Sequence, residues 1–160
     1  MANKQHTYSI RLDWTGNQGS GTSSYGAYSR AHELTAPGKA AIAGSSDPIF
    51  RGDPARWNPE QLLVAALAAC HQLWYLHLCA DAGVVVQGYG DNPSGLMIEQ
   101  PDGAGQFESV TLRPHARLAA GSDEQLARRL HDAAAEKCAI ARSMAFKVNH
   151  EPTFEIASKP

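Results

Sequence analysis

Three cysteines, Cys70, Cys79 and Cys138, are the residues of this chain with the widest choice of chemistry. A thiolate can act as a nucleophile, as a metal ligand or as a target of peroxides, whereas a buried protonated thiol is inert. Because the sequence has no Cys-X-X-Cys pair, and Cys70 with His77 would supply only two ligands, the spacing argues against a metal site. Three cysteines also form no paired framework, which favours a reducing compartment in which any disulfide is catalytic.

Cys70 lies in the middle of a long apolar stretch that is typical of a buried helix. Asn58 and Pro59 favour a helix start, and Gly83 suits the left-handed residue that ends a helix. The interval 61–80 contains no Asp, Glu, Lys or Arg, so we predict a helix that is buried on every side. Its length would suit a membrane span, but it carries two Gln and two His, which favours the core helix of a soluble protein.

The remaining sequence predicts an α+β protein that forms one domain over residues 1–160. Alternating apolar and polar residues predict strands at 8–14, 27–34, 39–43, 84–88, 96–99, 107–118 and 146–156. Ser122 and Gln125 form a capping-box pattern for a second, amphipathic helix that runs to about Cys138. The two cysteines Cys70 and Cys138 are therefore expected on two different helices.

The composition argues against several classes of function. A net charge of −2 and a pI near 6.4 give no electrostatic attraction to nucleic acid or to an anionic membrane surface. The first eight residues, MANKQHTY, contain no apolar run, so we expect no secretory signal. The sequence therefore predicts a cytoplasmic protein without nucleic-acid or membrane partners.

The arrangement of residues around the two cysteines resembles the OsmC/Ohr family of organic hydroperoxide reductases. The likeness rests on the NPEQL start of the first helix (residues 58–62), with Glu60 ten residues before Cys70 in an Ala-rich helix. It also rests on Cys138 late in the second helix, about seventy residues further on, and on Arg51 in the loop before the first helix. The strand pattern alone would not be specific.

The resemblance implies a fold and an assembly. The fold would be OsmC-like, with antiparallel sheets packed on a long buried central helix and a second helix, in an intertwined homodimer. The residues themselves also favour a dimer. Glu60 and Cys70 are about 15 Å apart along one helix and point about 80° apart, so Glu60 is expected to serve Cys70 of a second chain.

The resemblance also implies an enzyme, a thiol peroxidase that needs no metal or organic cofactor. Cys70 would attack an organic hydroperoxide and become a sulfenic acid. Cys138 would resolve it as a disulfide, which a dithiol reductant, for example a lipoylated protein, would then reduce. Arg51 would stabilise the thiolate and Glu60 would hold the guanidinium in place. The alternative is a non-enzymatic dimer that binds an apolar small ligand.

The sequence departs from the family pattern beside both cysteines. His71 follows the first cysteine, where the family often has an aromatic residue, and Ala139 follows the second, where it often has Pro. The catalytic arginine is also open, because Arg56 and Arg30 are available besides Arg51. Four apolar residues near the predicted site in sequence could form the walls of a substrate pocket: Phe50, Trp57, Leu73 and Trp74.

Overall fold

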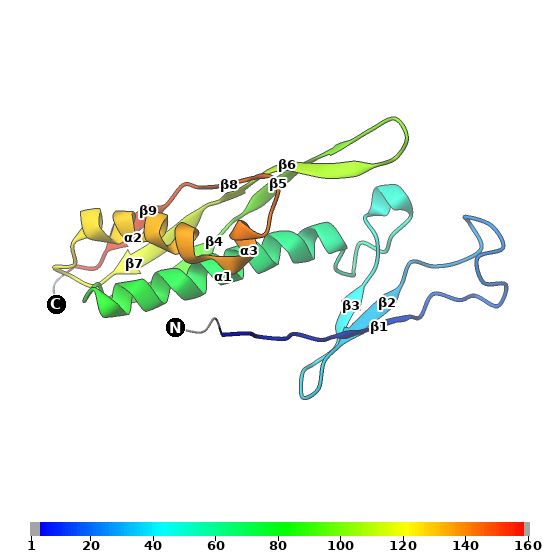
Figure 1. Cartoon of the computed structure of the whole chain (residues 1–160), viewed down its shortest axis with the longest axis horizontal. Coiled ribbons are helices and arrows are strands. Elements are labelled where there is room, and N and C mark those ends of the chain that lie inside the picture. The colour runs from blue at the N-terminus through cyan, green and yellow to red at the C-terminus, as the bar shows by residue number, and fades with distance from the viewer. Residues whose placement is uncertain (1–3, 159–160) are drawn as a thin grey trace. The chain divides into compact units, whose positions relative to one another are not determined.

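The computed structural model describes residues 4–158, and its longest element is the helix α1, Pro59–Asp81 (Figure 1). The helix begins where the sequence predicts. The Gln61 N–H donates to Asn58 Oδ1 at 2.8 Å, and the Asn58 N–H donates to Gln61 Oε1 at 3.2 Å. This reciprocal pair satisfies two backbone donors at the helix start. Gly83 has a φ of +73°, so the predicted left-handed residue after the helix is confirmed.

The chain divides into two compact units, Met1–Leu62 and Leu63–Pro160, and the boundary falls in the first turn of α1. In the first unit, three short strands form an antiparallel sheet in the order β1-β2-β3. They are β1 (Arg11–Trp14), β2 (His32–Thr35) and β3 (Ile42–Gly44), followed by the 3-10 helix η1 (Pro48–Phe50). All three strands lie where they are predicted, but each is shorter or shifted by a few residues.

The second unit contains two three-stranded sheets and two further helices. Its elements are β4 (Val86–Asp91), β5 (Ser94–Glu99), β6 (Gly105–Leu112), β7 (Pro114–Leu118), α2 (Glu124–Lys137), α3 (Ala139–Arg142), β8 (Lys147–His150) and β9 (Thr153–Ile156). The sheet orders are β4-β7-β9 and β5-β6-β8. The predicted α+β class is confirmed. The sheets are mixed rather than wholly antiparallel, because β8 pairs parallel to β6 and β9 parallel to β7 after the crossover through α2.

Two stretches that are predicted as single strands are each divided in two. The stretch 107–118 is interrupted at Arg113, whose N–H donates to Asp91 Oδ1 at 2.7 Å instead of joining a ladder. The stretch 146–156 is interrupted at Pro152, which has no N–H to donate. At both interruptions the chain leaves the sheet β5-β6-β8 and enters the sheet β4-β7-β9.

One stripe of α1 is buried, and the prediction of burial on every side is wrong for the single chain. The buried residues recur every fourth position, at Leu67, His71, Tyr75 and Cys79. The other faces are less covered, and Leu73 is 68% exposed. The reason is that the strands and α2 of the second unit pack against one side of the helix. By length and composition, α1 is also the one helix among the described residues that could cross a membrane, a test that soluble core helices pass too.

Helix α2 begins one residue later than its capping-box pattern predicts. The carboxylate of Asp123, not the Ser122 hydroxyl, accepts the Leu126 N–H at 3.0 Å. At the other end, Cys138 closes α2 and at the same time caps the short helix α3, which the sequence does not predict. The side chain of Cys138 is therefore fixed at a sharp junction between two helices.

Candidate thiol site

The structure brings Cys70 of α1 and Cys138 of the α2–α3 junction together. Both are free thiols, with Cys70 partly buried and Cys138 fully buried. Burial, followed by a side-chain hydrogen bond with Cys70, raises the pKa of Cys138 to about 11. At neutral pH, Cys138 is therefore a protonated thiol beside the sulfur of Cys70. Cys79 is 1% exposed and packs in the apolar cluster further along α1.

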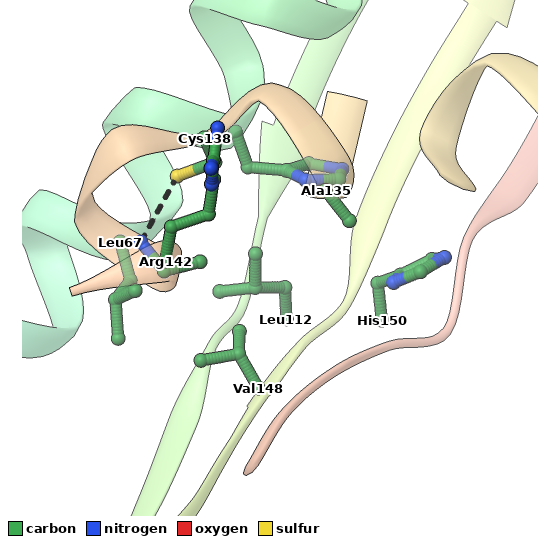
Figure 2. A pocket seen from close by; sticks show the side chains of 9 residues that line it. Leu67, Leu112, Ala135, Cys138, Arg142, Val148 and His150 are labelled. Carbon is green, nitrogen blue, oxygen red and sulfur yellow. Dashed lines mark hydrogen bonds between the residues drawn. The ribbon is translucent and has the colours of Figure 1, made fainter. Parts of the chain in front are cut away.

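The junction between α2 and α3 fixes the sulfur of Cys138. The Ala141 N–H donates to Cys138 Sγ at 3.4 Å, the hydrogen bond that Figure 2 marks with a dashed line. A cavity of about 180 Å³ lies beside this sulfur. It is lined by Leu67, His71, Leu112, Ala135, Cys138, Ala141, Arg142, Val148 and His150. The cavity is thus mainly apolar, with two imidazoles, a guanidinium and a thiol as its polar groups.

A pair of buried histidines adjoins the thiols. His71 Nε2 lies 2.9 Å from His131 Nδ1, and the two rings are nearly coplanar, at 8° with centroids 5.2 Å apart. His71 is 2% exposed and His131 is fully buried. The pKa of His71 is lowered to about 4 and that of His131 to about 3, mainly because both rings are buried. Both imidazoles are therefore neutral at pH 7, and one donates an N–H to the other.

Further contacts fix the rings of this pair. Tyr75 stacks on His131 with ring centroids 3.7 Å apart, and Phe154 lies 5.8 Å away. His150 lies 5.7 Å from the His71 ring, and its own Nε2 is 2.9 Å from Asp132 Oδ1. The second nitrogen of His131, Nε2, is buried and has no hydrogen-bond partner among the described residues.

Sequence reasoning missed these histidines as part of a site. One signal was present. His71 occupies a position of the buried stripe, four residues after Leu67, and His131 falls four residues after Ala127 on the buried face of α2. Imidazoles on two apolar faces each require a polar partner, and each can supply the other.

In the first unit, two of the three candidate arginines are held by other groups. Arg30 donates to the carbonyl oxygens of Tyr28 at 2.6 Å and Tyr25 at 2.8 Å. Its guanidinium also lies 4.3 Å and 4.2 Å from the centroids of those two rings. Arg56 lies 3.8 Å from Asp53 and donates to the carbonyl oxygen of His32 at 3.3 Å. Both guanidinium groups therefore support the local loop structure.

Arg51 differs from these two. Its guanidinium lies 5.9 Å from the centroid of Tyr25 and has no ion pair or side-chain hydrogen bond within residues 4–158. Its backbone is left-handed, with a φ of +63°, at the end of η1. Such a conformation is uncommon for a residue with a side chain. Glu60, on the first turn of α1, has a buried carboxylate oxygen, Oε2, without a hydrogen-bond partner in the described part of the chain.

The four residues predicted to bind substrate are divided between the two units, and neither Leu73 nor Trp74 lines the cavity beside Cys138. Phe50 ends η1 and Trp57 precedes α1 in the first unit, where Trp57 is 52% exposed. Leu73 and Trp74 lie on α1 in the second unit; Leu73 is exposed, and Trp74 packs beside the core with Lys137 Nζ 5.6 Å from its ring. Their role in a substrate pocket stays a prediction.

Among the described side chains, no group of three or more His, Cys, Asp or Glu is arranged to hold a metal ion.

Comparison with known proteins gives a consistent result. A family model described as OsmC-like protein matches residues 52–153. An OsmC-like protein of unknown function from Vibrio cholerae is 30% identical, with a TM-score of 0.82 over 93% of this chain and 100% of its own. The organic hydroperoxide resistance protein OsmC from Legionella pneumophila is 18% identical (TM-score 0.67; 95% and 98% covered). The organic hydroperoxide resistance protein OhrB of Bacillus subtilis is 20% identical, with a TM-score of 0.61 over 92% of this chain and 98% of its own. No curated protein sequence matches this chain.

Proposed function

Because the chain belongs to the OsmC/Ohr family of OsmC-like proteins, we propose that it is a thiol peroxidase that reduces organic hydroperoxides. The observation that carries the proposal is the contact between Cys70 and Cys138, two free thiols that come from different helices. A protein that only binds an apolar ligand needs neither thiol. The names of the Legionella and Bacillus proteins, both called organic hydroperoxide resistance proteins, support the same class of activity.

The reaction uses the two thiols in sequence. The thiolate of Cys70 attacks the outer oxygen of the hydroperoxide, an S–O bond forms, and the O–O bond breaks. The alkoxide leaves as an alcohol after it takes a proton, and Cys70 is left as a sulfenic acid. The sulfur of Cys138 then attacks Cys70, water leaves, and a disulfide forms. A dithiol reductant, for which a lipoylated protein is one candidate, returns both thiols.

The burial of the two thiols suits these two roles. Cys70 is partly accessible, so a substrate can reach its sulfur, whereas Cys138 is fully buried. A buried thiol with a raised pKa reacts poorly with peroxides in solution. Cys138 is thus reserved for the sulfenic acid that forms beside it.

We infer that Arg51 supplies the guanidinium that stabilises the thiolate, because Arg30 and Arg56 are bound elsewhere in the first unit. Glu60 would orient it, and the unpartnered Oε2 of Glu60 needs a donor of this kind. Since Glu60 and Cys70 point about 80° apart on one helix, the site is best completed by a second copy of the chain. The exposed apolar face of α1 around Leu73 supports such a homodimer.

Thiol titration tests the proposed function directly. One equivalent of cumene hydroperoxide should remove two of the three thiols of each chain, and mass spectrometry should place the disulfide between Cys70 and Cys138. Cys79 should keep its thiol. Hydrogen peroxide should react more slowly, because a bulky apolar peroxide buries more surface against the protein. Binding of the peroxide with all three thiols retained would instead indicate the non-enzymatic, ligand-binding alternative.

Mixed dimers test the composite site. A dimer of one Glu60→Ala chain and one Cys70→Ser chain should place both lesions in one site and leave the other intact. It should therefore recover about half of the wild-type activity, whereas each variant homodimer has two defective sites. A fully active particle with the mass of a single 17.2 kDa chain would contradict the dimeric site.

A further inference from the structure

We propose that Tyr25 is a positioning residue for Arg51, and that it holds the arginine both at the preceding peptide bond and at the guanidinium. The inference rests on the proposed function, in which Arg51 stabilises the thiolate of Cys70. Tyr25 lies in the glycine- and serine-rich loop between β1 and β2, and both Tyr25 and Arg51 belong to the first unit. Tyr25 is 58% exposed, so it does not serve as a core residue.

The backbone at Arg51 requires support from its surroundings. Its φ of +63° is in the left-handed region, which a residue with a side chain keeps only where neighbouring groups hold it there. The Arg51 N–H donates to the carbonyl oxygen of Pro48 at 2.9 Å. On the other side of the same peptide bond, the carbonyl oxygen of Phe50 accepts the hydroxyl groups of Tyr25 at 3.3 Å and Ser46 at 3.2 Å. These hydrogen bonds fix the direction in which the arginine side chain leaves the backbone.

The Tyr25 ring and the adjacent Gly26 hold the other end of the arginine. Cζ of Arg51 lies over the ring, 5.9 Å from its centroid, a distance at which the ring still attracts a cation. Three guanidinium atoms lie 3.6, 3.8 and 3.9 Å from the position that a Cβ of Gly26 would occupy. A methyl group at Gly26 would thus only touch the guanidinium, but a longer side chain would take its place. The loop therefore provides both a surface and a space for this guanidinium.

An aromatic ring holds a guanidinium without using its hydrogen-bond donors. Within residues 4–158 the Arg51 side chain makes no hydrogen bond or ion pair, so its N–H donors stay free for a carboxylate, a thiolate or a peroxide oxygen. Arg30 in turn holds Tyr25, because it donates to the Tyr25 carbonyl oxygen at 2.8 Å and lies 4.2 Å from the centroid of the same ring. One arginine therefore supports the loop, and the loop presents Tyr25 to the other arginine.

A double-mutant cycle between Tyr25 and Arg51 tests the inference. The rate constant of Cys70 oxidation by cumene hydroperoxide and the pH profile of Cys70 alkylation by iodoacetamide are measured in the wild type, in Tyr25→Leu, in Arg51→Gln and in the double variant. Tyr25→Leu should lower the rate constant about tenfold, because one cation–π contact and one hydrogen bond are lost. It should also move the alkylation profile toward higher pH. In the Arg51→Gln background the same substitution should change neither quantity, since the group that Tyr25 positions is absent.

Three further substitutions separate positioning from a structural role. Tyr25→Phe keeps the ring and loses the hydroxyl, so its rate constant should lie between those of the wild type and Tyr25→Leu. Gly26→Leu leaves Tyr25 intact but fills the space of the guanidinium, so it should slow the oxidation of Cys70 more than Gly26→Ala does. It provides the same test if Tyr25→Leu does not fold. Tyr8→Leu, at an 89% exposed tyrosine of the same unit, is the matched control and should leave both measurements unchanged.

An equal loss of rate on Tyr25→Leu with and without Arg51 would overturn the inference, because Tyr25 would then act independently of the arginine. Wild-type behaviour of both Tyr25→Leu and Gly26→Leu would overturn it as well. Failure of the proposed function gives different results. If Arg51→Gln alone leaves the oxidation of Cys70 unchanged, Arg51 is not the arginine of the site. If the wild-type protein forms no sulfenic acid, it is not a peroxidase.

Discussion

Cys70→Ser should lower peroxide consumption to the rate of buffer alone, because a serine hydroxyl is not ionised at neutral pH and cannot replace the thiolate. Cys138→Ser should behave differently. It should consume one equivalent of cumene hydroperoxide and then stop, with Cys70 held as a sulfenic acid that no second thiol can resolve. Peroxide loss followed over time, with trapping of the sulfenic acid by dimedone and mass spectrometry, distinguishes the two outcomes.

Cys79→Ser provides the matched control for this pair. It makes the same atomic change on the same helix as Cys70→Ser, but in the apolar core and away from the cavity. Burying a hydroxyl there should destabilise the protein by roughly 1–3 kcal/mol, while turnover per folded molecule stays near the wild-type value. Turnover that survives in Cys70→Ser but is lost in Cys79→Ser would show that Cys79, and not Cys70, is the reactive thiol.

Acidification from pH 7 to pH 5 should destabilise the protein by about 4 kcal/mol through His71 and His131 alone. Burial lowers the pKa of His71 to about 4 and that of His131 to about 3, below the unfolded value of about 6.5. The unfolded chain therefore binds protons at these two positions from pH 6.5 downward, while the folded protein does not. Stability is complete above pH 6.5 and falls as the pH drops towards 4. Urea unfolding at several pH values measures this slope.

A double variant tests the assignment of the acid sensitivity. In His71→Gln with His131→Phe, both titrating groups are absent, so the loss between pH 7 and pH 5 should shrink by most of the 4 kcal/mol. His77→Gln should keep the full loss, because His77 is largely exposed beside Asp81. An equal loss in all three proteins would show that groups other than this pair cause the sensitivity.

Helix α1 and its limits could be predicted from the sequence because the signals are local. Asn58, Gln61 and Gly83 act within a few residues of the positions that they fix. The presence of Cys70 and Cys138 on separate helices followed from the same kind of signal. Their contact depends on the packing of α1 against the α2–α3 junction, and only the family resemblance indicated it.

Features that depend on distant partners were missed for a physical reason. The division of 107–118 into β6 and β7 results from pairing with different sheets, and Pro114, the first residue of β7, is a local signal of it that the alternating pattern obscures. His71 and His131 are sixty residues apart in the chain, and neither has a local partner that would mark it as part of a site. The choice among the arginines likewise required knowledge of which carbonyl groups and rings hold Arg30.

The paired interruptions at Arg113 and Pro152 have a consequence for the order of folding. Each sheet of the second unit takes one of its three strands from the last fourteen residues of the described chain, β8 for one sheet and β9 for the other. A nascent chain that has emerged only as far as α3 can form the β5–β6 and β4–β7 pairs, but neither sheet can be completed. The parallel pairs that remain join distant parts of the sequence, and such contacts form slowly. The second unit therefore reaches its native state only after its C-terminal strands have left the ribosome. Until then the native packing around the Cys138 thiol is incomplete.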